Sequence, residues 1–73
     1  MASKYVWRVG FIDGWLAAES MTLADLESHA TVFASRKAAE AALAACLEKI
    51  GGAFPVLVRY KDGRRDSTQW WRP

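Results

Sequence analysis

The chain has 73 residues, of which 52% are hydrophobic, 25% charged and 12% aromatic, and its formal net charge at pH 7 is +2. This length predicts one domain, residues 1–73, and the apolar fraction excludes a disordered chain. The sequence has no apolar run near the ~18 residues of a membrane span, and its first residues lack the apolar stretch of a secretory signal. The single cysteine, Cys46, excludes an intrachain disulfide and suits a reducing compartment. We therefore expect a cytoplasmic domain that does not contact a membrane.

The first predicted element is a β-hairpin. Residues 4–12 are rich in β-branched and aromatic side chains, with apolar residues at every second position. Asp13-Gly14 follows, and such a pair is typical of a two-residue hairpin turn because both residues accept a positive φ. The return strand is expected over residues 15–19. The predicted register pairs Ile12 with Trp15, Phe11 with Leu16, Val9 with Ala18 and Arg8 with Glu19.

The centre of the chain predicts one helix after a segment of undecided structure. Residues 20–35 leave open whether they form a short helix, a strand or a loop. Ser35 is a good N-cap for a helix over residues 36–50, and Gly51-Gly52 is a good stop. Apolar side chains recur along this helix at intervals of three and four residues and predict one buried stripe, composed of Ala39, Ala42, Leu43, Cys46, Leu47 and Ile50.

The last segment repeats the hairpin pattern. Residues 54–61 predict a strand with Pro55 at its beginning or at an edge, Asp62-Gly63 predicts a second turn, and residues 64–71 return. The predicted register pairs Arg59 with Asp66, Val58 with Ser67 and Val56 with Gln69. The chain as a whole predicts a two-layer α+β fold of order ββαββ, in which a single helix covers one face of an antiparallel sheet made of two hairpins.

The run ATVFASRKAAEAAL, residues 30–43, follows the pattern A-T-x-F-x-S-x-x-x-A. It resembles small phage and mobile-element α+β proteins in which a short strand ending in Phe meets a Ser-capped helix. In those proteins an aromatic hairpin often precedes the pattern, as Trp15 and the run Thr22-Leu23-Ala24-Asp25-Leu26 do here. The resemblance covers about half of the chain and carries no catalytic residue. It implies a phage or mobile-element origin, and phage proteins of this size are frequently inhibitors or adaptors that act by binding, anti-CRISPR proteins among them.

The residue types that catalysis or metal binding requires are scattered along the chain. The only histidine, His29, lies in the undecided segment, and Cys46 belongs to the apolar stripe, where a thiol is inert. Turns, a cap and cross-strand partners account for most of the carboxylates, and the sequence contains no phosphate-binding loop or metal-ligand spacing. We therefore predict a protein that is not an enzyme, with no catalytic residues, no metal, no cofactor and no small-molecule substrate.

The distribution of charge suggests a nucleic-acid surface as the alternative function. Residues 51–73 contain five basic and two acidic residues, a net charge of +3, whereas residues 1–50 contain five basic and six acidic residues, a net charge of −1. Arginine interleaved with aromatic rings suits phosphate backbones and stacked bases. This alternative surface consists of Tyr60, Lys61, Arg64, Arg65, Trp71 and Arg72.

The face of the sheet opposite the helix is the leading candidate surface, for binding a protein partner or for self-association. We expect Val56 and Val58 beneath the helix, so that their neighbours in sequence face away from it. Tryptophan, arginine and aliphatic side chains together have the composition of a recognition surface. A net charge of +2 is modest for a nonspecific nucleic-acid binder, which places nucleic acid second. The predicted partner-binding residues are Arg8, Ile12, Trp15, Leu57, Arg59 and Trp70.

Overall fold

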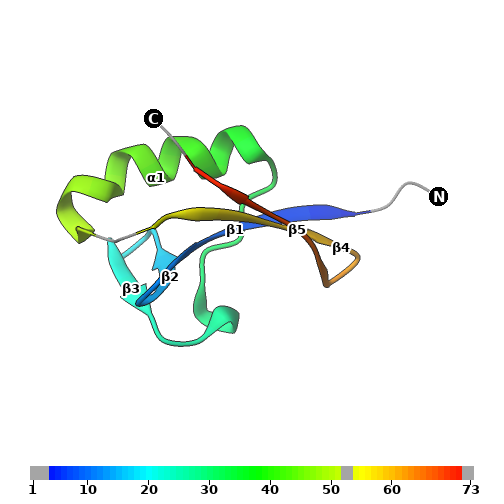
Figure 1. Ribbon diagram of the computed structural model, residues 1–73, viewed down its shortest axis with the longest axis horizontal. Helices are drawn as coiled ribbons and strands as arrows, with labels where there is room; N and C mark the ends of the chain where they lie inside the picture. The colour runs from blue at the N-terminus through cyan, green and yellow to red at the C-terminus, as the bar shows by residue number, and fades with distance from the viewer. Residues whose placement is uncertain (1–3, 52–53, 72–73) are drawn as a thin grey trace.

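The computed structural model describes residues 4–51 and 54–71. In chain order its elements are β1 (Tyr5–Phe11), β2 (Gly14–Ala17), β3 (Thr22–Ala24), the 3-10 turn η1 (Glu27–His29), α1 (Arg36–Ile50), β4 (Val56–Lys61) and β5 (Arg64–Trp70). All strand pairs are antiparallel, and the sheet has the order β3-β2-β1-β4-β5 with α1 on one face (Figure 1). The α+β class with one helix on an antiparallel sheet is confirmed. The predicted order ββαββ is wrong, because a third strand precedes the helix.

The segment 20–35 contains the elements that its sequence left open. Met21 adopts a positive φ of 54° and turns the chain back, so that Thr22–Ala24 pairs with β2 as the edge strand β3. After η1, Phe33 exchanges two backbone hydrogen bonds of 2.8 Å with Trp7 of β1. The pairing of Phe33 with Trp7 joins segments distant in sequence, which no local pattern predicts, whereas β3 pairs with β2 across the short connection 18–21.

The helix α1 begins and ends where its capping residues predict. The Ser35 hydroxyl accepts a hydrogen bond from the amide of Ala38 at 3.2 Å, and Gly51 ends the helix with a left-handed φ of 64°. Gly52, the second residue of the predicted stop, lies outside the described residues. The predicted stripe is confirmed: its buried members are Ala39, Leu43 and Cys46, and its partly buried members are Ala42, Leu47 and Ile50.

The first hairpin turns one residue earlier than predicted. Phe11 pairs with Gly14, which leaves Ile12 and Asp13 as the two turn residues. Gly14 lies in strand β2 and is required there by space, because an added Cβ would stand 2.7 Å from the carbonyl oxygen of Ala24 on β3. The register differs from the prediction by two residues. Each side chain therefore keeps its predicted face although its cross-strand partner changes.

The second hairpin uses the predicted turn and then departs from the predicted register. Asp62 and Gly63 both have positive φ, at 50° and 84°, as the turn requires. A bulge at Arg59 shifts the pairing by one residue, so that this arginine pairs with Ser67 instead of Asp66. Arg59 still reaches its predicted partner through the side chain, since its Nε donates to Oδ2 of Asp66 at 2.7 Å.

The two faces of β4 are the reverse of the prediction. Val9 pairs with Leu57, so both side chains share the core beneath α1, where each has an exposed fraction of 0%. Val58, and with it Val56, lies on the opposite face. The run Val56–Val58 is apolar at every position, so alternation cannot indicate which side faces inward, and pairing with β1 decides it. Leu57 and Arg59 consequently lie on the helix side of the sheet.

Candidate binding surface

The face of the sheet turned away from α1, called the second face below, has a covered half and an open half. In the covered half, Val58 and Tyr60 are each only 2% exposed although no helix lies over them. The turn η1 lies on this side of the sheet, opposite α1 (Figure 1), and is followed by Ala30, which is 7% exposed. A short loop therefore covers part of a face that the sequence predicts to be open.

A polar cluster of Glu27, Arg65, Arg8 and Tyr60 holds the covered half together. Arg65 donates from Nη2 to Oε2 of Glu27 at 2.5 Å, which ties η1 to the edge strand β5. The guanidinium of Arg8 lies 4.5 Å from the centroid of the Tyr60 ring, and that of Arg65 lies 5.6 Å from the centroid of Trp15. The Tyr60 hydroxyl is buried near the carboxylate without a well-aligned hydrogen bond.

The groups of the polar cluster shift the pKa values of their neighbours and so fix the charge that each one carries. Burial alone would raise the pKa of Glu27, but the Tyr60 hydroxyl and the guanidinium groups of Arg65 and Arg8 lower this pKa below its usual value. Burial raises the pKa of Tyr60, and the nearby carboxylate raises it further. The hydrogen bond to Glu27 raises the pKa of Arg65. The cluster at neutral pH therefore consists of an ionised carboxylate, two guanidinium ions and a neutral phenol.

The open half carries an apolar row across four strands. Trp15, Gly10, Val56 and Trp70 are successive cross-strand partners on β2, β1, β4 and β5. A Cβ added at Gly10 would stand 3.3 Å from both Trp15 Cζ3 and Val56 Cγ2, so the missing side chain leaves room for the indole. At the end of the row, Phe54 meets Trp70 edge-to-face with 6.1 Å between ring centroids. We call Trp15, Val56, Trp70 and Phe54 the aromatic row.

Three of the predicted partner-binding residues lie on the second face. Trp15 and Trp70 belong to the aromatic row, while Arg8 is held in the polar cluster by the Tyr60 ring. Ile12 is 69% exposed at the tip of the first hairpin. The structure thus brings the two predicted tryptophans into one row, and it separates them from the arginine expected beside them.

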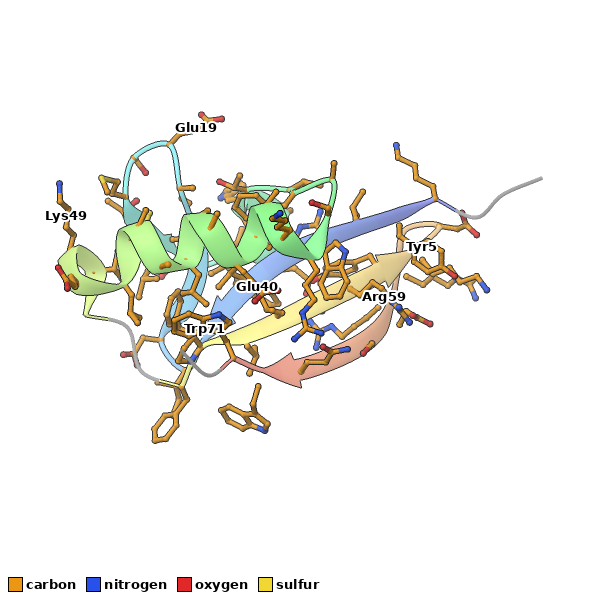
Figure 2. All side chains as sticks on the ribbon, turned by 90° about the horizontal axis from the view of Figure 1, so that it is seen from above. Tyr5, Glu19, Glu40, Lys49, Arg59 and Trp71 are labelled. Atoms are coloured by element: carbon orange, nitrogen blue, oxygen red, sulfur yellow. The ribbon has the colours of Figure 1, made fainter. Side chains whose placement is uncertain are left out.

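Leu57 and Arg59, the other two predicted residues, do not belong to this surface. Leu57 is fully buried beneath α1. The guanidinium of Arg59 lies 5.1 Å from the ring centroid of Tyr5 and 6.0 Å from that of Trp7, on the helix side of the sheet (Figure 2). There it completes its ion pair with Asp66. The reversed faces of β4 account for both corrections.

The alternative nucleic-acid surface does not form as one surface. Tyr60 is buried in the polar cluster, and Trp71 packs against the core next to α1 (Figure 2), so neither ring joins the cations of the second turn. Base stacking by these two rings would require them to leave their packed positions. The basic residues of this set are Lys61 and Arg64, exposed at the turn, Arg65, paired with Glu27, and Arg72, which lies outside the described residues.

Phe54 and the outer edge of β5 are the parts of the site that the sequence did not reveal. Phe54 has a positive φ of 54°, so it leaves the strand direction and its ring reaches Trp70. The pattern of residues 54–61 placed it inside a strand, where its ring would have joined one of the two faces. The outer position of β5 depends on the order of all five strands, which follows from tertiary pairing.

The described residues form no candidate site for a small molecule or a metal ion. Residues 4–51 and 54–71 form no pocket, and no group of three His, Cys, Asp or Glu side chains among them could hold a metal ion. The described part of the chain also has no helix with the length and apolar character needed to cross a membrane. Comparisons with protein-family models, with curated proteins and with solved structures give no match to this chain.

Proposed function

We propose that this protein is a small non-catalytic binding module that occupies the surface of a partner protein through the aromatic row. The observation that carries this proposal is the Phe54–Trp70 pair. Its two rings are 63% and 66% exposed and continue inward through Val56 to Trp15. Exposed aromatic rings at the end of an apolar row resemble the anchors that fill pockets in protein interfaces.

The biological setting follows from the resemblance of residues 30–43 to small phage and mobile-element proteins. A protein of that origin would work in the cytoplasm of the host as an inhibitor or adaptor, for example by blocking a host defence factor in the manner of an anti-CRISPR protein. Such a role requires only that the protein cover a functional surface of its target. The aromatic row suits that requirement because Trp15, Val56 and Trp70 are held on paired strands of one sheet.

Nucleic-acid binding is the second candidate, and Lys61 and Arg64 are the observation in its favour. Both side chains are exposed at the β4–β5 turn and form no ion pair with the described residues. Two cations bind phosphate groups weakly, and the rings that would stack on bases are packed elsewhere. Protein binding therefore accounts for more of the exposed surface than nucleic-acid binding does.

A capture experiment with matched variants tests the proposal. The tagged protein is incubated with host lysate, with and without nuclease, and bound proteins are quantified by mass spectrometry. Trp70→Ala should lose the specific partner, because an interface tryptophan typically contributes ~2 kcal/mol or more. Tyr5→Ala is the control, since Tyr5 is aromatic and 43% exposed but lies on the helix side. Both variants are first checked for native circular dichroism.

The same experiment separates the two candidate functions. Loss of the partner in Trp70→Ala, with no effect of nuclease, supports the protein-binding module. Capture that persists in Trp70→Ala but disappears with nuclease or in a Lys61→Ser, Arg64→Ser double variant supports nucleic-acid binding and contradicts the proposal.

A further inference from the structure

The two edges of the sheet are protected to different degrees. Proteins usually protect edge strands by making them short or by placing bulges, prolines or charged residues on them. The edge strand β3 has only three residues. The edge strand β5 has seven, and beyond its bulge the segment 67–70 is regular and contains neither proline nor a charged residue. This segment is therefore an open template for strand pairing.

One hydrogen bond between β4 and β5 determines which backbone amides of β5 point outward from the sheet. The amide of Trp71 donates to the carbonyl oxygen of Pro55 at 3.1 Å, which makes these two residues a hydrogen-bonded pair. Bonded and non-bonded pairs alternate along an antiparallel ladder. The amides of Thr68 and Trp70 consequently point away from β4, and β4 is the only described strand that pairs with β5. The side chain of Thr68 lies on the second face, next to that of Trp70 in the aromatic row.

We propose that β5 accepts an extended segment of the partner protein as a sixth strand, antiparallel to β5, apolar in its first half and acidic in its second. This inference rests on the proposed function and specifies the form of the partner. Addition of a strand to a sheet edge combines backbone hydrogen bonds, which provide affinity, with alternate side chains, which provide specificity. Every described strand pair in this sheet is antiparallel, and antiparallel pairing is slightly the more stable kind.

The order of apolar and acidic residues in the segment follows from the two ends of β5. Trp70 and Phe54 form an apolar end. Lys61 and Arg64 form a basic end without ion pairs among the described residues, and its net charge is +1 because Asp62, which accepts a hydrogen bond from the Lys4 amide, lies between them. These ends are separated by roughly 20 Å along the strand. A segment that runs antiparallel begins beside Trp70 and finishes beside Arg64, so its apolar residues come first and its carboxylates about five residues later.

A second copy of this chain suits the edge less well. If two β5 strands paired antiparallel, the basic end of each copy would lie beside the Trp70 of the other. No carboxylate would then approach Arg64 and Lys61 except through rearrangement of the Arg59–Asp66 pair. An acidic segment neutralises these cations directly. Charge complementarity therefore favours a separate partner over self-association.

The test uses two blocked peptides as probes, Ac-Val-Thr-Ile-Thr-Val-Glu-Thr-Glu-NH2 and its order-reversed form Ac-Glu-Thr-Glu-Val-Thr-Ile-Thr-Val-NH2. Binding to the full chain is followed by NMR titration and by amide hydrogen exchange. We expect the first peptide to bind more tightly than the second, to bind less tightly as salt is raised, and to slow exchange of the Thr68 and Trp70 amides. Two further versions of the first peptide carry N-methyl groups on every second backbone nitrogen, one at the odd and one at the even positions. Only the version whose methyl groups replace the amide hydrogens that bond to β5 should fail to bind.

Thr68→Pro and Thr68→Val form the matched pair of variants. Proline removes the outward amide of an edge residue and leaves the bonds to β4 in place, whereas valine keeps the amide. We expect Thr68→Pro to weaken peptide binding by about tenfold or more and Thr68→Val to leave it nearly unchanged. Native circular dichroism and unaltered resonances of α1 establish that the proline variant is folded. If it is not folded, the methylated peptides test the same backbone bonds on the unmodified protein.

The outcomes separate this inference from the proposed function. If neither peptide binds, or if exchange of the Thr68 and Trp70 amides is unaffected, strand addition by an acidic segment is wrong. A protein partner lost in Trp70→Ala but retained in Thr68→Pro would likewise contradict strand addition and leave the proposed function standing. Partner binding that survives in Trp70→Ala contradicts the proposed function itself. A dimer in sedimentation that dissociates in Thr68→Pro would assign the edge to a second copy and overturn the acidic segment.

Discussion

The indole of Trp15 lies across the backbone of β1 at Gly10, against Val56 on the far side. A Cβ at this glycine would stand 3.3 Å from an atom of each neighbour, closer than ordinary van der Waals contact. Gly10 therefore leaves the space above β1 to side chains from the two neighbouring strands, Trp15 of β2 and Val56 of β4. The cross-strand pairs Trp15–Gly10, Gly10–Val56 and Val56–Trp70 connect the inner end of the aromatic row to its exposed end.

Replacement of Gly10 by valine should displace the indole and destabilise the fold. Overpacking in a well-packed region typically costs about 1–3 kcal/mol, which urea unfolding would measure. The rescue control is the double variant Gly10→Val, Trp15→Leu, in which a smaller side chain makes room for the new one. Partial recovery of stability is expected. If the double variant loses the sum of the two single effects, the two side chains do not compete for one space.

Gly63 in the second turn and Gly14 in strand β2 should differ in which substitutions they tolerate. Gly63 has a φ of 84° and open space around its Cα, so Gly63→Asn should be tolerated and Gly63→Val should cost about 1 kcal/mol or more. At Gly14 the obstacle is the Ala24 carbonyl oxygen at 2.7 Å, which excludes any Cβ. Both Gly14→Asn and Gly14→Ala should therefore be destabilising. Equal melting temperatures for the Asn variants would contradict this distinction.

Local signals predicted the elements that depend on neighbouring residues. Ser35 and Gly51 cap the helix where the sequence places its ends, and Asp62-Gly63 forms its turn, because capping and turn formation are decided within a few residues. The first turn moved by one residue because Gly14 is needed beside β3, a strand that was not predicted. The choice between the turn at 12–13 and the turn at 13–14 therefore depends on a strand outside the first hairpin.

The candidate site was predicted only in part, for a related reason. Trp15 and Trp70 were placed on the correct face. Leu16 is fully buried beneath the helix, so its neighbour Trp15 lies on the second face, whereas Trp70 reaches that face because the register shift at the bulge and the reversal of β4 offset each other. Leu57 and Arg59 were placed on the wrong face because β4 is apolar on both sides, with Val58 only 2% exposed on the second face. The covering loop has no strong apolar pattern of its own. Its ion pair with β5, between Glu27 and Arg65, joins residues 38 positions apart.

Cys46 should react slowly with a thiol reagent in the native protein. Its side chain is 4% exposed within the helix stripe, between Leu43 and Ile50, so reaction requires the helix to lift from the sheet. The rate with an aromatic disulfide at neutral pH should rise strongly when urea unfolds the chain. Cys46→Ala should keep the fold, whereas Cys46→Ser buries a hydroxyl and should be less stable than the alanine variant. Rapid native labelling would contradict the burial of this thiol.

The attachment of η1 should weaken in acid, because it depends on the ionised carboxylate of Glu27. The pKa of Glu27 is lowered in the folded protein, so folding favours the deprotonated carboxylate. The stability that this contributes is present above the ordinary pKa of 4.5 and is lost as the pH falls through the pKa of the folded state. Glu27→Gln should therefore be less stable than the unmodified protein at about pH 7, and the difference should shrink towards about pH 3. Glu40→Gln is the matched control, since Glu40 forms an exposed pair with Arg36 at 3.0 Å that contributes little at either pH. Urea unfolding monitored by tryptophan fluorescence measures the stability of both variants. If Glu27→Gln and the unmodified protein are equally stable at neutral pH, η1 is held by apolar contacts alone.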